Sequence, residues 1–160
     1  MPKSQYDLGY LLETLAEDRR ATLSAICEKA EELGFVPTVT AMDEHARDWK
    51  CDCVKPKVKP KRALCIVRVK DGDWSAKLCL DHVEQYDSAL NEASPRVKAQ
   101  LCAAPKCGSH GGSCKGAVYF VVDGVRTPKC RMALTVKDLE AEDVLSVLRL
   151  LQMEATARPG

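Results

Sequence analysis

Two Asp-Gly pairs, Asp71-Gly72 and Asp123-Gly124, constrain the fold of this chain more than any other feature. Each pair separates two runs in which apolar residues recur with the spacing of a strand. A two-residue hairpin turn of type I′ needs positive φ at both central positions, and Asp-Gly adopts this conformation at low cost. The sequence therefore predicts two β-hairpins, and in the second one, with strands over 117–122 and 125–134, Ala117 lies opposite Cys130.

Helical periodicity flanks these strands on both sides. Leucines at 8, 11, 12 and 15 predict a helix over about 5–17, and a second apolar stripe predicts a helix over about 20–33. Helical spacing over 81–93 is followed by Ser94 and Pro95, which are typical of the start of another short helix. A closing helix is expected over 138–155, with Leu139, Val144, Leu145, Leu148 and Leu151 facing inward.

The order of these elements predicts the fold class. Strands are grouped along the chain instead of alternating one by one with helices, which favours an α+β fold. We expect a mostly antiparallel sheet with an N-terminal helix pair, middle helices and a C-terminal helix. The 160 residues fit one domain over 1–155 with a disordered tail over 156–160. Neither an apolar run near 18 residues nor a secretory signal is present, so no membrane association and a cytoplasmic location are expected.

The chain has nine cysteines, an odd number that cannot all pair within one molecule. A domain of this size buries enough surface to fold without disulfides. In a cytoplasmic protein, thiols are the default state. The cysteines are then buried small side chains, metal ligands or reactive thiols.

Four of the cysteines predict a metal site in the last 60 residues of the chain. Cys102, Cys107, Cys114 and Cys130 have the spacing C-x4-C-x6-C-x15-C, and the segment 103–116 carries four glycines and one proline. Such a segment has little apolar surface to offset its chain entropy, and a structural zinc ion with four ligands would hold it. His110 is an alternative ligand, and an iron–sulfur cluster is the alternative cofactor.

The remaining cysteines are interpreted mainly as core residues. Cys27 lies on a helical apolar stripe, and Cys65 alternates with neighbouring valines. Cys51 and Cys53 share one face of a predicted strand, although together with His45 and Cys65 they are also a candidate second metal site. Cys79 falls on the polar face of its strand and is the predicted exposed thiol.

A basic segment suggests a second function. Residues 50–70 contain eight Lys or Arg against one Asp. The candidate phosphate-binding residues in the predicted loop are Lys55, Lys57, Lys59, Lys61 and Arg62. The loop has no aromatic residue for base stacking, so nucleic-acid binding is an alternative to a solvated loop.

Enzymatic activity is not favoured by any motif. The chain has no nucleophile elbow, no P-loop and no zinc-protease helix. Cys107, Cys114 and His110 are the candidates for a thiol or redox enzyme, which is the third function considered. His82, next to Asp81 at the start of a predicted helix, is interpreted as a capping residue.

Residues 64–154 resemble uncharacterised small bacterial α+β proteins that carry a C-terminal cysteine cluster. The residues that carry this resemblance are Leu78, Leu80, Tyr86, Cys102, Cys107, Cys114, Gly124, Cys130 and the run 148–151. The resemblance implies a domain of unknown function and no catalytic residue. The leading hypothesis is a binding or regulatory domain, with an unknown ligand or protein partner, that is stabilised by one zinc site.

Overall fold

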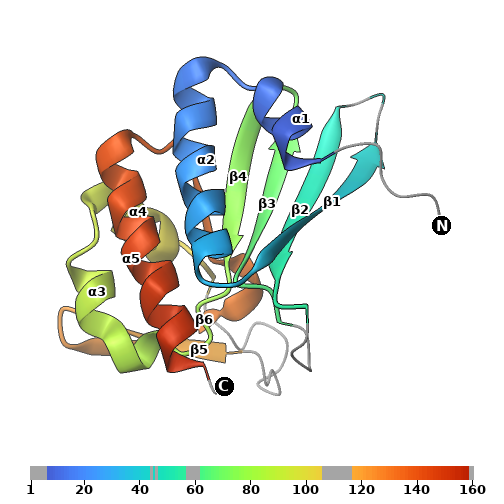
Figure 1. The fold of residues 1–160 in the computed structure, drawn as a ribbon. Coiled ribbons are helices and arrows are strands. Elements are labelled where there is room, and N and C mark those ends of the chain that lie inside the picture. Colours follow the sequence, from blue (N-terminus) through green and yellow to red (C-terminus); the bar gives the residue numbers. More distant parts are fainter. Residues whose placement is uncertain (1–6, 44, 46, 57–61, 106–116, 159–160) are drawn as a thin grey trace.

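The computed structural model describes residues 7–43, 45, 47–56, 62–105 and 117–158, and it confirms the predicted α+β fold (Figure 1). The larger antiparallel sheet has the strand order β1 (Val36–Asp43), β2 (Asp48–Val54), β3 (Cys65–Lys70), β4 (Asp73–Leu78), β7 (Thr135–Lys137). A separate hairpin consists of β5 (Ala117–Val122) and β6 (Val125–Cys130). The helices are α1 (Leu8–Glu13), α2 (Glu17–Glu32), α3 (Asp87–Asn91), α4 (Pro95–Cys102) and α5 (Ala141–Ala157), with 3₁₀ helices η1 (Val83–Tyr86) and η2 (Arg131–Ala133). Within the described ranges, no helix has the length and apolar character needed to cross a membrane.

Both predicted hairpin turns are confirmed. Asp71 and Gly72 have φ values of 52° and 80°, and Asp123 and Gly124 have φ values of 50° and 82°. These positive angles are the ones that a type I′ turn requires. The register also follows the prediction, because Ala117 is paired with Cys130 across β5 and β6.

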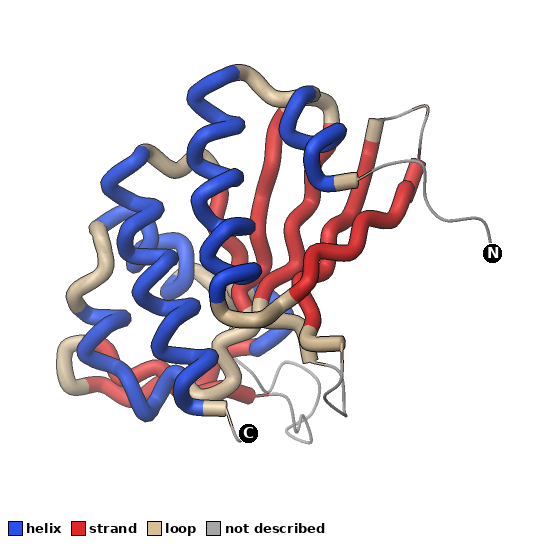
Figure 2. Tube along the Cα trace, viewed as in Figure 1, coloured by secondary structure: helices blue, strands red, loops and turns tan. Residues whose placement is uncertain are grey.

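Among the described residues, the helices α1, α2 and α5 lie on one face of the larger sheet. Figure 2 shows α1 and α2 lying across one face, with α5 beside α2. Side chains on the covered face are fully buried, as at Cys51 and Cys53 in β2, whereas Lys50 and Asp52 on the other face are partly exposed. This alternation is the period-two pattern of a half-buried antiparallel sheet.

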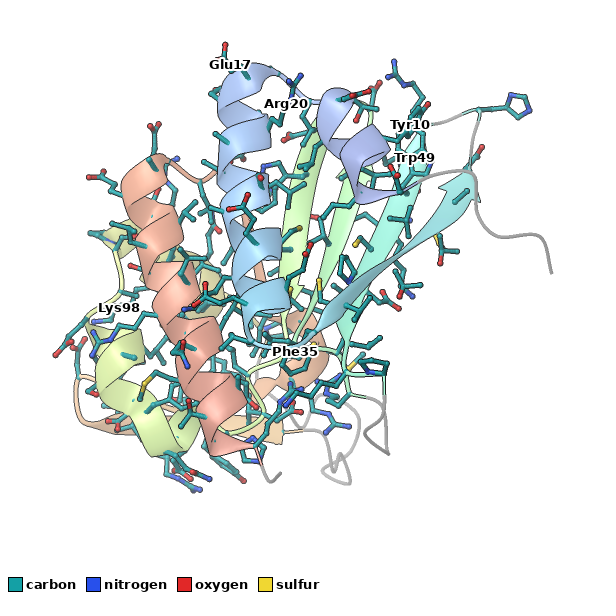
Figure 3. All side chains as sticks on the ribbon, viewed as in Figure 1. Tyr10, Glu17, Arg20, Phe35, Trp49 and Lys98 are labelled. Carbon is teal, nitrogen blue, oxygen red and sulfur yellow. The ribbon has the colours of Figure 1, made fainter. Side chains whose placement is uncertain are left out.

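In the N-terminal helix pair, the first helix is shorter than predicted and the second begins three residues earlier, and the pair buries residues of both expected stripes. Asp7 caps α1 by accepting a hydrogen bond from the backbone N–H of Tyr10 at 2.9 Å, and the helix ends at Glu13. Leu11, Leu15, Leu23 and Ile26 are among the buried core residues. Figure 3 shows Tyr10 over Trp49, with ring centroids 5.5 Å apart in an edge-to-face arrangement.

The segment predicted as the long second strand of the C-terminal hairpin contributes one strand to each of the two sheets. β6 ends at Cys130, η2 turns the chain, and β7 joins the larger sheet by pairing with β4. Leu134 and Val136 are fully buried in this position. The prediction of one strand over 125–134 is wrong because the edge of β4 offers both backbone partners and a core that a two-stranded hairpin lacks.

The middle of the chain follows the predicted helices with one break. Ser94 caps α4 by accepting a hydrogen bond from the N–H of Val97, and Pro95 occupies the first turn. The segment predicted as one helix over 81–93 divides into η1 and α3. His82 is the residue that precedes η1, but its side chain makes no capping hydrogen bond.

The C-terminal helix begins later and ends later than predicted. Glu140 and Asp143 form a reciprocal capping box, so α5 begins at Ala141 and continues to Ala157. Leu145 is 68% exposed, and the prediction that it faces inward is wrong because the buried stripe runs through Val144, Val147 and Leu151. The predicted disordered tail is also wrong for 156–158, since two of these residues are helical and Arg158 is anchored.

Candidate functional site

Two of the four predicted metal ligands lie in the described part of the chain, at neighbouring ends of secondary structure. Cys102 is the last residue of α4, and Cys130 is the last residue of β6. Both cysteines are free thiols with intermediate burial. Cys107, His110 and Cys114 fall in 106–116 and lie outside the described residues.

The described structure holds both ends of 106–116 at Cys130. The backbone N–H of Cys130 donates to the carbonyl oxygen of Pro105 at 2.9 Å. Ala117 is the strand partner of Cys130 on β5. Cys107 follows Pro105 by two residues, which can span at most about 7 Å. Cys114 precedes Ala117 by three residues, which can span at most about 10 Å. Both cysteines are therefore within short chain reach of Cys130.

Lys129 ties the hairpin to the end of α4. Its Nζ donates to the carbonyl oxygens of Cys102 at 2.6 Å and of Ala104 at 3.0 Å. The last carbonyls of a helix lack intrahelical partners, and a cation beside them also complements the negative end of the helix dipole. This clamp, together with the bond to Pro105, connects the end of α4 to the end of β6. The sequence analysis missed it, although a lysine next to a candidate cysteine ligand was visible.

In the part of the chain that the structure describes, the surroundings of Cys102 and Cys130 included, no three His, Cys, Asp or Glu side chains come together as a group that could hold a metal ion. This finding includes the candidate second site with His45. His45 is exposed at the loop after β1, whereas Cys51, Cys53 and Cys65 are fully buried. The metal interpretation of these three cysteines is therefore wrong. The core interpretation is confirmed for them and for Cys27.

Four of the buried cysteines, on α2, β2 and β3, lie close together in the core. Cys53 and Cys65 are directly opposite each other in β2 and β3. Burial raises the pKa of Cys27 to about 12. Hydrogen bonding to Cys53, followed by burial, raises the pKa of Cys51. The contact with Cys51 lowers the pKa of Cys53, but the contact with Cys65 and burial outweigh it and leave the pKa raised. Such thiols are small apolar groups and poor nucleophiles.

Cys79, the predicted exposed thiol, is fully buried. β4 ends at Leu78, and the backbone N–H of Cys79 donates to the carbonyl oxygen of Leu64. Because the strand ends there, the alternation of faces no longer applies, and Leu78, Cys79 and Leu80 are buried in succession. Burial is the main cause that raises the pKa of Cys79.

The predicted phosphate-binding loop is only partly described, and its described members have other partners. Arg62 makes a two-pronged ion pair with Asp81, at 2.8 and 2.9 Å, which raises the pKa of the guanidinium. Lys55 places its Nζ 5.4 Å from the centre of the Phe35 ring. Lys57, Lys59 and Lys61 lie outside the described residues.

A buried carboxylate that the sequence analysis missed lies at the end of α5. Glu154 is fully buried and accepts hydrogen bonds from the Tyr86 hydroxyl at 2.6 Å, the His82 backbone at 2.9 Å and Arg158 Nε at 2.9 Å. His82 Nδ1 lies 2.8 Å from Glu154 Oε2, the oxygen that also accepts from Arg158. A buried carboxylate needs such partners. The signal was available, since Glu154 continues the helical stripe of Val147 and Leu151.

Through Arg158, this carboxylate helps to connect the end of α5 to the segments that flank β3 and β4. Arg158 also donates to the carbonyl oxygens of Arg62, Ala63 and Cys79. Burial, followed by the nearby Glu154 charge, raises the pKa of Tyr86, so that the phenol remains a donor. Every oxygen of Glu154 is occupied by these partners, and the arrangement is that of a structural hub.

Comparison with protein-family models, with curated proteins and with solved structures found no match in any of the three. The resemblance of residues 64–154 to small bacterial α+β proteins stays a prediction.

Proposed function

We propose that the chain is a binding or regulatory domain in which Cys102, Cys107, Cys114 and Cys130 hold one structural zinc ion. The observation that carries this proposal is the closure of 106–116 at its base, where Pro105 and Ala117 both contact Cys130. Four sulfur ligands around zinc need to approach within about 2.3 Å of one point. The chain reach of Cys107 and Cys114 allows this approach.

The distribution of the nine cysteines also supports the proposal. Five of them are buried in the core and have a packing role there. The four that remain are the four candidate ligands, and the two that the structure describes are partly accessible. A thiolate centre also needs a reducing compartment, so the proposal includes a cytoplasmic location. A closed site with four protein ligands stabilises the fold and does not require an enzyme.

The first test is the metal content of freshly purified, reduced protein, measured together with its visible absorption. About one zinc per chain is expected. Iron with visible absorption would instead support the iron–sulfur alternative. Failure of the reduced protein to take up either Zn²⁺ or Co²⁺ would contradict the metal proposal and leave the thiol or redox alternative, which a Cys107–Cys114 disulfide would support.

Variants assign the ligands. Cys114→Ser should lose the zinc and speed amide exchange in β5 and β6, since loss of a ligand opens the loop base. Cys27→Ala, which also removes one thiol, is the matched control and should retain the metal. His110→Ala separates the two ligand sets, because a four-sulfur site keeps its zinc whereas a site with three sulfurs and one nitrogen loses it.

A further inference from the structure

The face of the larger sheet opposite α1, α2 and α5 carries an unusual row of cations. On β2, β3 and β7, Lys50, Arg68 and Lys137 fall in one cross-strand row with Ser75 of β4 between the last two. The row contains no carboxylate. Because neighbouring strands are about 4.8 Å apart, the row spans about 14 Å from Lys50 on β2 to Lys137 on β7.

The arrangement is unfavourable for the isolated protein. Lys50 is directly opposite Arg68, and like charges in opposed positions destabilise a sheet. Their side chains are 37% and 47% exposed. Asp52 and Asp48 partly compensate, with Lys50 Nζ 3.6 Å from Asp52 and Arg68 Nε 2.7 Å from Asp48. These contacts moderate the repulsion within the row.

The rest of the face adds positive charge and hydroxyl groups. Lys77 lies in the neighbouring row, opposite Ile66 on one side and Thr135 on the other. Lys70 lies at the end of β3 next to the hairpin turn. The acidic residues of the face are Asp43, Asp48, Asp52 and Asp73. Asp48, Asp52 and Asp73 pair with Arg68, Lys50 and Arg19 respectively, and Asp43 accepts a hydrogen bond from the His45 backbone.

We propose that this face, centred on Lys50, Arg68, Lys77 and Lys137, binds the phosphate backbone of a double-stranded nucleic acid. A duplex carries one negative charge per about 1.7 Å of its axis, which complements a row of cations about 14 Å long. The aromatic residues of these strands, Trp49 and Trp74, are buried on the opposite face, so the surface has no platform on which single-stranded bases stack. Binding is therefore through phosphates, independent of sequence and strongly dependent on salt.

The test is fluorescence anisotropy with a labelled DNA duplex of about 20 base pairs at low salt, repeated with an RNA duplex of the same sequence. Wild-type protein should bind with a Kd of about 10–100 µM at low salt, and tighter binding of either duplex identifies the natural source of the phosphates. The triple variant Lys50→Gln, Lys77→Gln, Lys137→Gln should bind at least about tenfold more weakly. Its salt dependence should be shallower by about 2 to 3 in the log–log slope.

A matched triple variant on the helical side removes the same number of charges: Lys29→Gln, Lys98→Gln, Arg149→Gln. It should bind almost as well as wild type, because these residues lie on α2, α4 and α5. Equal weakening by both triples would overturn the proposal, since it would show an effect of net charge alone. Absence of wild-type binding at low salt, tighter binding of the single strand, or binding only to phosphatidylserine vesicles would also overturn it.

Thermal unfolding controls for damage to the fold. If the triple variant melts well below wild type, Lys77→Gln and Lys137→Gln are tested one at a time, and each should weaken binding about threefold. Arg68 is left unchanged because Asp48, its partner, is only 6% exposed and would lose its compensating charge. Two single variants that both bind as well as wild type would contradict the assignment of the surface.

Discussion

Two sets of cysteines in this molecule have the same chemistry and different physical uses. Cys27, Cys51, Cys53, Cys65 and Cys79 are buried among apolar side chains of the larger sheet and α2. Cys102 and Cys130 are partly accessible at the base of 106–116. Burial disfavours the thiolate, so the first set behaves as small hydrophobic residues. The difference teaches that cysteine count alone predicts neither a disulfide framework nor a metal site.

The strongest way to break this comparison is to place a charge in each set. Cys53→Asp should prevent cooperative folding or lower the free energy of unfolding by about 4 kcal/mol or more, because a carboxylate in the core has no partner. Cys130→Asp should leave a folded protein, since Cys130 is partly exposed. Circular dichroism during chemical denaturation measures both. Similar melting of the two variants would contradict the division.

Alkylation of the native, metal-free protein tests the same division without mutation. Cys102 and Cys130 should react with iodoacetamide at least about a thousandfold faster than the five buried thiols, since those react only after an opening that costs about 4 kcal/mol or more. Raising the pH to about 9 should not remove the difference, because the pKa of Cys27 is about 12. Mass spectrometry of peptides identifies each site. Early modification of Cys51 or Cys65 would be evidence against a closed core.

A milder substitution sharpens the comparison. Cys65→Ser should lower the free energy of unfolding by about 1–3 kcal/mol, because a hydroxyl buried without a full set of partners loses its hydration. Cys102→Ser should change the stability of the metal-free protein by about 0.5 kcal/mol or less. Urea unfolding of the two variants gives both values. A larger loss for Cys102→Ser would place it in the packed core instead.

The smallest effect concerns the hydrogen bonds by which Lys129 holds the end of α4, where Cys102 lies. Lys129→Met should lower the stability of the metal-free protein by about 1 kcal/mol, because the carbonyls of Cys102 and Ala104 lose their donor. Faster amide exchange is expected in the last turn of α4. Lys29→Met, which removes an exposed pair with Glu32, is the control and should have almost no effect. Unchanged exchange in α4 would show that Lys129 does not hold this end.

Local signals predicted much of the fold. The Asp-Gly turns, the Ser94 cap and the pairing of Ala117 with Cys130 depend on a few neighbouring residues, and they are confirmed. Errors appear where a distant segment decides the outcome. Cys79 is buried because its strand ends and its backbone bonds to Leu64. The chain after Cys130 leaves its hairpin because β4 has a free edge.

The candidate site divides in the same way. Spacing and composition selected Cys102 and Cys130 as candidate ligands. The hydrogen bonds of Lys129 to the end of α4 and of Cys130 to Pro105 come from packing between α4 and the hairpin. The buried hub at Glu154 also depends on segments about 70 residues apart in the chain, at His82 and Tyr86. The helical pattern is consistent with Glu154 on the inner stripe of α5, a signal that the sequence analysis overlooked, and it does not show which donors contact Glu154.

The sequence by itself determined the elements whose energetics are local: periodicity, caps and turns, and with them the α+β class. The tertiary structure alone decided which polar groups are desolvated together and which sheet edge receives a strand. It also decided that Lys50 lies opposite Arg68 on an open face. These outcomes depend on contacts between residues far apart in the chain, and burial and charge pairing change their energies only once the segments are brought into contact.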